Sequence, residues 1–239
     1  MYNGKKNTLY ILTKSKDNVN NNKNTCNNSN FMSAVKSVKD ESVRMFNNSF
    51  LHQLSFVHYT TPLIIFVPVV LYCLYQSIFV YELSIFYIIG LYIGGLCFWT
   101  LTEYILHRFI FHYEPPTAFG KRIHFITHGV HHEYPNDSRR LVMPPALSIP
   151  LASAFYFLFV YIFDSKATTA PFFAGFINGY LLYDMLHYAL HHLKSNNAIF
   201  LDLKQHHMWH HFKDSHNGFG VSSKFWDIVF RTTFKKITT

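Results

Sequence analysis

The sequence predicts an all-α integral membrane protein with about four transmembrane helices arranged in two hairpins. Four long apolar runs occur between residues 61 and 190. Only 14% of the residues are charged, whereas about a quarter are charged in a typical soluble domain. Lys and Arg also avoid the short connections between the runs. A soluble protein with buried helices is the alternative, but it would not explain this charge bias.

The segment before the first run divides into two parts. Residues 1–30 are rich in Asn and Lys, as in "NVNNNKNTCNNSN", and contain too few apolar residues to offset the entropy of ordering. We predict a disordered tail there, and no cleavable signal peptide is visible. Residues 31–57 carry scattered apolar positions, which fit either an interfacial helix or a plain linker. Residues 58–235 form the predicted membrane domain.

The four runs have the length and spacing of two helical hairpins. Residues 61–81 and 83–102 are each about long enough to cross a ~30 Å hydrocarbon core. Residues 147–163 are at the short end of that range, and residues 171–190 include Asp184 and His187 near their end. Only Glu82 separates the first pair, and only "DSKATTA" separates the second. Both connections are too short to hold a domain.

The basic residues predict the orientation of these hairpins. Eight of them lie in the long segments, namely Lys121, Arg122, Arg139, Arg140, Lys194, Lys204, Lys213 and Lys224, whereas the two turns contain only Lys166. By the positive-inside rule the long segments are cytoplasmic. The net charge of +8 therefore follows the topology, which disfavours a nucleic-acid partner. Three cysteines without a CxxC motif indicate no disulfide framework and a reducing compartment.

The histidines are concentrated on the predicted cytoplasmic side. Of the 16 in the chain, all but His52 and His58 lie between residues 107 and 216. Ten of them form four spaced groups, which are His107 and His112; His128, His131 and His132; His187 and His191; and His207, His210 and His211. One metal ion accepts about four to six ligands, so ten imidazoles predict two metal ions rather than one four-coordinate zinc.

The spacing within each group has geometric consequences. Residues three and four apart share one face of a helix, so His187 and His191 can bind one metal. In each HxxHH group the first histidine shares a face with both later ones. His107 and His112 are five residues apart, which places them about 140° apart around an α-helix. That pair either serves two metals or lies where the helix unwinds.

The setting favours iron as the metal. Imidazole suits Zn, Cu, Fe and Ni alike. Two ions held by nitrogen beside lipid, however, suit activation of O₂ and attack on an inert C–H bond. Glu103, Glu114, Glu133 and Asp184 are close enough in the sequence to keep hydrolytic zinc chemistry open. A membrane transporter would place its ligands near the bilayer midplane, whereas these histidines lie at helix ends and in loops.

Four stretches carry a family resemblance: "EYILHRFIFH", "HFITHGVHHEYPNDSRRLVMPP", "YDMLHYALHH" and "HHMWHHFKDSHNGFGVSSKFWDIVF". With the runs between them, they resemble the membrane fatty acid 2-hydroxylases of sphingolipids, within the fatty acid hydroxylase/sterol desaturase superfamily. The histidine pattern alone names only the superfamily. The phrases "RLVMPP" and "GFGVSSKFWDIVF" are specific to the 2-hydroxylase branch, and a sterol oxidase or desaturase remains the alternative.

The resemblance implies a multi-pass enzyme of the endoplasmic reticulum membrane with a cytoplasmic, histidine-rich dimetal catalytic dome. The ten histidines would bind two irons, with His207 rather than His206 as the ligand, and zinc could replace iron in recombinant material. The enzyme would insert one oxygen atom of O₂ at carbon 2 of a long acyl chain, in ceramide or in an activated acid. Many relatives carry a fused cytochrome b5 domain with an HPGG motif. This chain has no HPGG, so electrons would come from a separate cytochrome b5 and an NAD(P)H-dependent reductase.

Four further residues are candidates for the surroundings of the metals or for substrate contact. Asp184 lies three residues before His187 and could accept the second ring N–H of a ligand histidine, or serve only as a charge at a helix end. His124 is an additional histidine beside the second group. Asp137 and Arg139 either position the substrate head group or fix their own loop.

Aromatic and glycine residues supply the last expectations. Tyr134, Phe219 and Trp226 either line the acyl path or pack in the core. Gly218 and Gly220 predict a tight turn or a close approach of two backbones.

Overall fold

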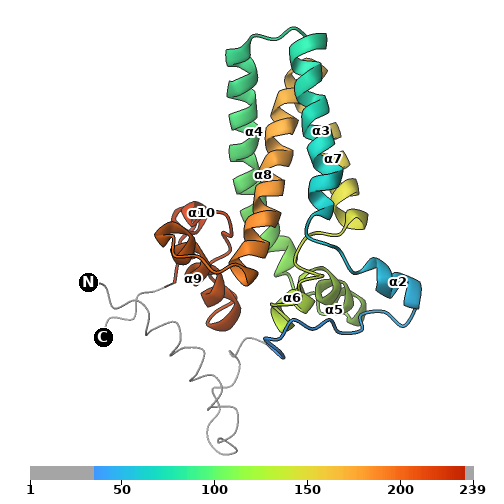
Figure 1. Cartoon of the computed structure of the whole chain (residues 1–239), viewed down its shortest axis with the longest axis vertical. Coiled ribbons are helices and arrows are strands. Elements are labelled where there is room, and N and C mark those ends of the chain that lie inside the picture. Colours follow the sequence, from blue (N-terminus) through green and yellow to red (C-terminus); the bar gives the residue numbers. More distant parts are fainter. Residues whose placement is uncertain (1–34, 235–239) are drawn as a thin grey trace, which may run out of the picture. The chain divides into compact units, whose positions relative to one another are not determined.

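The computed structural model describes residues 35–234, and all regular structure among them is helical. The long helices lie side by side, and the shorter elements gather near one end of them (Figure 1). The elements are α2 (Ser49–Leu54), α3 (Thr61–Tyr75), η1 (Gln76–Val80), α4 (Ile85–Ile105), η2 (Leu106–Phe111), α5 (Ala118–His124), η3 (Phe125–Gly129), α6 (Val130–Glu133), α7 (Pro145–Phe163), α8 (Lys166–His192), α9 (Ala198–Phe212) and α10 (Phe225–Val229), where η marks a π-helix.

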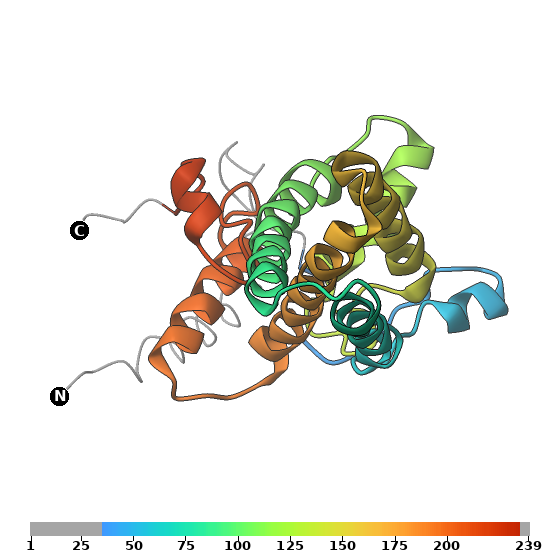
Figure 2. The same ribbon diagram turned by 90° about the horizontal axis from the view of Figure 1, so that it is seen from above.

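Among the described residues, three helices are long and apolar enough to cross a membrane: Thr61–Val80, Ile85–Phe111 and Pro145–Phe163. They correspond to the first three predicted runs, so a multi-pass membrane protein is confirmed. The fourth run lies in α8, which is 27 residues long and is not among these three. α8 has many buried residues along its length and packs against α3, α4 and α7 (Figure 2). Because protein rather than lipid surrounds it, α8 can contain more polar and small residues.

The four helices form two antiparallel pairs with both short connections at one end. The Tyr87 hydroxyl lies 3.2 Å from Thr168 Oγ1, which places the N-termini of α4 and α8 side by side. α3 reaches α4 through residues 81–84, and α7 reaches α8 through residues 164–165. The C-terminal ends of α4 and α8, which carry two of the histidine groups, therefore lie at the opposite end.

Glycines allow α4 and α8 to touch through their backbones. A Cβ added at Gly95 would lie 1.9 Å from the Phe172 carbonyl oxygen, and one at Gly175 would lie 1.9 Å from the Tyr92 carbonyl oxygen. Small residues permit such close approach, which stabilises helix pairs in lipid by van der Waals packing. The contact fixes the two helices that present His107 and His187 to the site.

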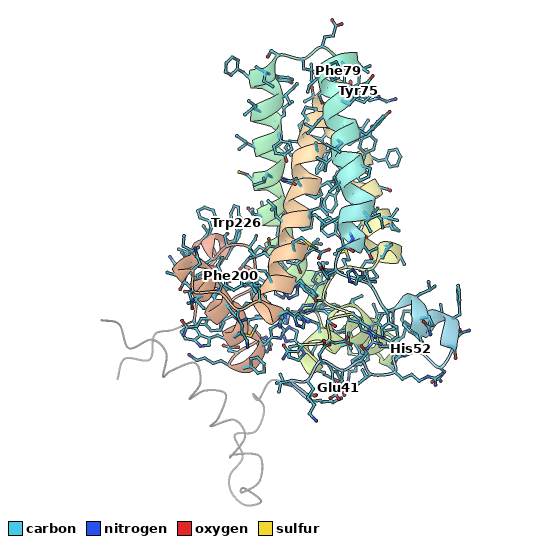
Figure 3. The ribbon with its side chains drawn as sticks, viewed as in Figure 1. Glu41, His52, Tyr75, Phe79, Phe200 and Trp226 are labelled. Atoms are coloured by element: carbon cyan, nitrogen blue, oxygen red, sulfur yellow. The ribbon has the colours of Figure 1, made fainter. Side chains whose placement is uncertain are left out.

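The segment predicted as an interfacial helix or a linker runs along the loop after α6. The Lys36 and Val57 amides donate to the carbonyls of Glu133 and Arg139, at 2.8 and 2.9 Å. Its only helix among the described residues is the six-residue α2, which has no buried residue. Figure 3 shows His52 on this helix, whereas Tyr75 and Phe79 lie toward the opposite end of the molecule. The predicted disordered tail, residues 1–30, lies outside the described residues.

Candidate metal centre

The ten predicted histidines meet in two clusters at the C-terminal ends of α4 and α8. In each cluster one ring nitrogen from every member lies within 4.8 Å of the others, so each can hold a metal ion. Cluster A consists of His107, His112, His128, His132 and His210, and cluster B of His131, His187, His191, His207 and His211. This arrangement is consistent with the predicted dimetal centre.

Both HxxHH groups are divided between the two clusters. His128 and His132 belong to cluster A, and His207 and His211 to cluster B, so the histidines four residues apart stay together. The third member of each group, His131 or His210, joins the other cluster. The first histidine of each group therefore shares its cluster with the second of the two later histidines and not with the first. The clusters abut, with the His132 and His211 rings 4.4 Å apart.

A π-helix explains why His107 and His112 share a cluster despite their spacing. His107 is the second residue of η2 and His112 directly follows its last residue, and the His112 amide donates to the His107 carbonyl at 3.2 Å. A π-helix repeats its hydrogen bonds at five residues rather than four. Five residues therefore return the chain to the same side, and the two rings are 5.0 Å apart. Of the two predicted alternatives, the change in helix winding is the one that occurs.

The spacing of the ring nitrogens fits metal coordination better than hydrogen bonding. In cluster A the Nε2 atoms of His107, His112 and His128 lie 3.2–3.3 Å from one another. Two nitrogens at about 2.1 Å from one ion and at right angles are separated by about 3.0 Å. In a triangle of neutral imidazoles, each Nε2 has at most one proton to share between two neighbours. An ion at the centre would satisfy all of these lone pairs at once.

Backbone carbonyls fix the ring tautomers of two cluster A histidines. His107 Nδ1 donates to the Phe219 carbonyl at 2.5 Å, and His210 Nδ1 donates to the Asn217 carbonyl at 2.7 Å. A carbonyl only accepts, so the proton of each neutral ring is on Nδ1. The Nε2 lone pairs of both rings are consequently available toward the centre of the cluster.

The cluster electrostatics keep these imidazoles neutral. Burial lowers the pKa of His132 to about 3, with further lowering by neighbouring histidines. Burial and nearby imidazoles likewise hold the pKa of His128, His210 and His211 well below the usual range. Neutral histidine is the form that binds metal, so the sites are prepared for ligation at neutral pH.

A cavity of about 380 Å³ opens beside both clusters. His128 of cluster A and His131 and His187 of cluster B form part of its wall. Most of the remaining wall is apolar and comes from α2, the segment around Leu141 and the start of α7. A long apolar substrate in this cavity would contact the histidines of both clusters.

Comparison with known proteins agrees with this site. The profile of the family described as "Fatty acid hydroxylase" matches residues 92–232, which include all ten cluster histidines. The chain belongs to the fatty acid hydroxylase family.

Individual relatives of this hydroxylase are named for closely similar activities. A dihydroceramide fatty acyl 2-hydroxylase of Arabidopsis thaliana is 37% identical over 80% of both chains. A fatty acid 2-hydroxylase of Rattus norvegicus is 36% identical over 80% of this chain and 56% of its own length. The solved structure of full-length scs7p, with only its hydroxylase domain visible, has a TM-score of 0.74 and 37% identity, covering 80% of this chain and 71% of that one. The sequence-based prediction of a fatty acid 2-hydroxylase is confirmed.

The other candidate residues fall outside the two clusters of the hydroxylase. His124 ends α5, and its Nδ1 is buried without a hydrogen-bond partner among the described residues. Asp137 is buried and accepts from Ser42 Oγ at 2.7 Å and from Arg140 Nη1 at 3.2 Å. Arg139 lies over the Phe56 ring. Of the two predicted roles for Asp137 and Arg139, these contacts match the fixing of their loop.

Asp184 does not accept the ring N–H of His187 in the structure. Its side chain is fully buried in the cavity wall, with the Tyr180 hydroxyl and the Met143 backbone nearby. Both carboxylate oxygens, the Tyr180 hydroxyl and His187 Nδ1 are buried and have no hydrogen-bond partner among the described residues. The hydrogen bond from a ligand histidine, one of the two predicted roles of Asp184, is therefore not formed among the described residues.

The three aromatic residues do not line the cavity. Phe219 packs on the rings of His107 and His210, and Trp226 donates to Thr100 Oγ1 at 3.0 Å. Phe219 is buried, as core packing requires, whereas Trp226 and Tyr134 are partly exposed. The glycine expectations are met, because Gly218 has a positive φ of 73° and a Cβ at Gly220 would lie 2.1 Å from the Ser223 carbonyl oxygen.

Sequence reasoning missed three residues with clear positions in the site. Arg140, rather than Arg139, reaches the cavity wall. Glu103 and Asp227 are buried carboxylates whose oxygens accept backbone amides of residues 219–222. Glu103 lies four residues before His107, a spacing that could have indicated a shared helix face, whereas no local signal connects Asp227 to the histidines.

Proposed function

We propose that the chain hydroxylates carbon 2 of the long fatty acyl chain of ceramide or a related sphingolipid, and that the ten clustered histidines bind two iron ions. The observation that carries this proposal is the cavity whose wall includes histidines of both clusters. When bound, the irons would supply the activation of O₂ needed to oxidise an unactivated C–H bond. Zinc could occupy the same nitrogen sites in recombinant material.

The cavity residues account for the position of the acyl chain. Val142, Leu147 and Leu54 give an apolar wall that holds methylene groups and excludes water. Carbon 2 is bonded to the carbonyl carbon, so the polar end of the acyl group must also lie near the histidines. His131 and His187 are the wall residues beside which carbon 2 would be placed.

Asp184 and Arg140 supply the polar groups for that end. Burying the Asp184 carboxylate without a donor is costly, and a donor from the substrate would offset this cost. An amide N–H of ceramide adjacent to the acyl carbonyl has the required chemistry, and it would reach the buried Asp184 oxygens once that side chain turns toward the cavity. The Arg140 guanidinium donates to Asp137 and lies over Phe56, so it presents a fixed positive edge toward acyl oxygens. This choice of ceramide over a free activated acid follows from the acceptor at Asp184.

The membrane arrangement completes the proposal. α3, α4, α7 and α8 would cross the bilayer as two hairpins, with the histidine clusters on the cytoplasmic face of the endoplasmic reticulum. Two observations support this arrangement. The contact between Tyr87 and Thr168 places the N-terminal ends of α4 and α8 side by side, and the basic residues lie in the long segments. An acceptor site for N-glycosylation inserted at residues 164–165 should be modified in cells, whereas one at residues 194–196 should not.

Electrons would come from cytochrome b5 reduced by an NAD(P)H-dependent reductase. No HPGG motif occurs in the 239 residues, so the donor is proposed to be a separate chain. Cells that lack cytochrome b5 should then give little product from well-expressed enzyme, and supplying a soluble cytochrome b5 domain should restore it.

Lipid mass spectrometry in a host without its own sphingolipid 2-hydroxylase tests the activity. The wild type should produce 2-hydroxyacyl ceramides. His191→Ala should abolish them because it removes a cluster B ligand. His58→Ala is the matched control, since His58 is exposed and its ring interacts with the neighbouring Thr60 and Tyr59, and it should leave the product unchanged.

Two results would contradict the proposal. Altered sterols or new double bonds, without 2-hydroxyacyl ceramides, would move the chain to the sterol oxidase or desaturase activities of the same superfamily. Product from His191→Ala equal to that of the wild type would remove cluster B from the mechanism.

A further inference from the structure

The loop of residues 217–222 connects the cluster A histidines to the C-terminal part of the chain. Its Phe219 and Asn217 carbonyls accept the Nδ1 protons of His107 and His210. The two histidines come from η2 and α9, which are far apart in the sequence. The position of this one loop therefore sets the ring orientation of two of the five cluster A nitrogens.

Asp227 holds the loop through the backbone amides of Phe219 and Gly220. Its Oδ1 accepts from the Phe219 amide at 2.9 Å and from Thr232 Oγ1 at 2.7 Å. Its Oδ2 accepts from the Gly220 amide at 2.9 Å and from His206 Nε2 at 3.0 Å. The side chain is fully buried, so no water competes for these four hydrogen bonds.

The loop has little freedom to adopt another conformation. Gly218 has the left-handed φ that other residues rarely adopt, and Gly220 touches the Ser223 carbonyl so closely that a Cβ would clash. The amides of Val221 and Ser222 both donate to Glu103 Oε1, at 2.8 and 2.9 Å. Successive amides are thus bound by two buried carboxylates.

Cluster B has no equivalent support. The Nδ1 atoms of His187, His191, His207 and His211 are buried and have no hydrogen-bond partner among the described residues. None of the cluster B rings is hydrogen-bonded to residues 217–222 in the part of the chain that the structure describes. A change in the loop would therefore act on one cluster and leave the other in place.

We propose that Asp227 is a positioning residue for metal binding at cluster A alone, acting through the Phe219 and Gly220 amides and the loop carbonyls on His107 and His210. This inference rests on the proposed function, in that both clusters bind metal. Loss of such an outer partner costs about 10–100-fold in metal affinity. That loss should appear at one of the two sites only.

Asp227 and Glu103 differ in how many of their carboxylate oxygens accept loop amides. The Phe219 and Gly220 amides donate to different oxygens of Asp227. In Asp227→Asn one of these oxygens becomes an NH₂ group, so one loop amide loses its acceptor whichever way the side chain is turned. Both loop amides at Glu103 donate to the same oxygen. Glu103→Gln keeps that oxygen, and its new NH₂ can donate to the Ser222 hydroxyl, which is already its neighbour.

The test measures zinc content of the full chain in detergent. Wild type, Asp227→Asn and Glu103→Gln are stripped of metal, reloaded with Zn²⁺, dialysed against a series of chelator concentrations and assayed by mass spectrometry for zinc per chain. The wild type and Glu103→Gln should each retain both zinc ions over the same range of chelator concentrations. Asp227→Asn should release one ion at a chelator level about 10–100-fold lower and keep the other as in the wild type.

Double variants show which cluster has lost its ion. Adding His191→Ala to Asp227→Asn should leave no tightly bound zinc, whereas adding His210→Ala should still leave one. Asp202→Asn makes the same chemical change at an exposed residue paired with Lys224 and should behave as the wild type. Helix content by circular dichroism confirms that each variant is folded.

Several outcomes would overturn the inference. They are unchanged zinc retention in Asp227→Asn, equal weakening of both ions, or an equal effect of Glu103→Gln. A wild-type chain that retains no zinc at either cluster would instead contradict the proposed metal centre. If Asp227→Asn does not fold, Thr232→Val carries the test. It removes one donor to Asp227 and should weaken the same single site by a smaller factor, and no change in that site would overturn the inference.

Discussion

Two adjacent glycines on α4 should respond in opposite ways to the same substitution. Gly95 faces the backbone of α8, and an added Cβ would lie 1.9 Å from the Phe172 carbonyl oxygen. At Gly94 the nearest atom to an added Cβ is a Phe172 ring carbon at 3.6 Å, an ordinary contact distance. We expect Gly95→Ala to destabilise the protein and Gly94→Ala to be tolerated.

The magnitude follows from the distance that the helices must move. Ordinary contacts begin at 3.4 Å, so α4 and α8 would have to separate by about 1.5 Å (3.4 minus 1.9), and backbone rather than a flexible side chain must shift. Overpacking of this kind costs about 1–3 kcal/mol. For a chain of this size each kcal/mol lowers Tm by about 2–4 °C, which gives a decrease of roughly 2–12 °C. Gly94→Ala should gain about 0.5–1 kcal/mol from helix propensity.

The assay is the thermal unfolding of each purified variant in the same detergent, followed by the loss of its monodisperse chromatographic peak. Gly90→Ala provides a further control, because no atom lies within 4 Å of an added Cβ there. The reasoning would be refuted if Gly95→Ala unfolded at the same temperature as Gly94→Ala or above it, since the close contact between α4 and α8 would then not exist.

Three further predictions concern the cavity, the loop after α6 and the histidines. Leu147→Trp puts a larger side chain into the wall and narrows the cavity. Lipid mass spectrometry should then show less 2-hydroxylation of long acyl chains, while zinc per chain stays at the wild-type value. Asp137→Asn weakens the buried pair with Arg140 and should cost about 1–3 kcal/mol, seen as a lower Tm than that of the exposed control Asp202→Asn. In metal-free protein, Tm should fall as pH decreases below about 6.5, because unfolded histidines take up protons there whereas His132 keeps a pKa of about 3; a Tm independent of pH between 7 and 5 would contradict this.

The membrane helices were predictable to the extent that lipid surrounds them. Lipid requires an apolar surface along the whole helix, so α3, α4 and α7 have unmistakable composition. α8 is surrounded by protein, and its polar and small residues reflect those contacts rather than lipid. The spacing of Gly175 and Gly179 was the available signal for its packing, since small residues four apart indicate a close helix pair.

The histidines of the site could be identified from the sequence, but their division between the clusters could not. Identity follows from the unusual density of imidazoles at helix ends. The division depends on the π-helix that brings His112 back to His107 and on which face of α9 meets α6. Both are tertiary features, because a π-helix persists only where its surroundings favour it. Asp227 was equally hidden, since its partners are backbone amides that carry no side-chain signature.

The crossed assignment of the two HxxHH groups builds both candidate metal sites on the same two helices, α6 and α9. His131 and His132 are neighbours on the four-residue α6, yet they point into different clusters. His210 and His211 are divided in the same way on α9. Any rotation of either helix would draw nitrogens away from one site and press them into the other. The distance between the two sites is therefore set by the spacing of adjacent residues along one helix, which the backbone geometry fixes.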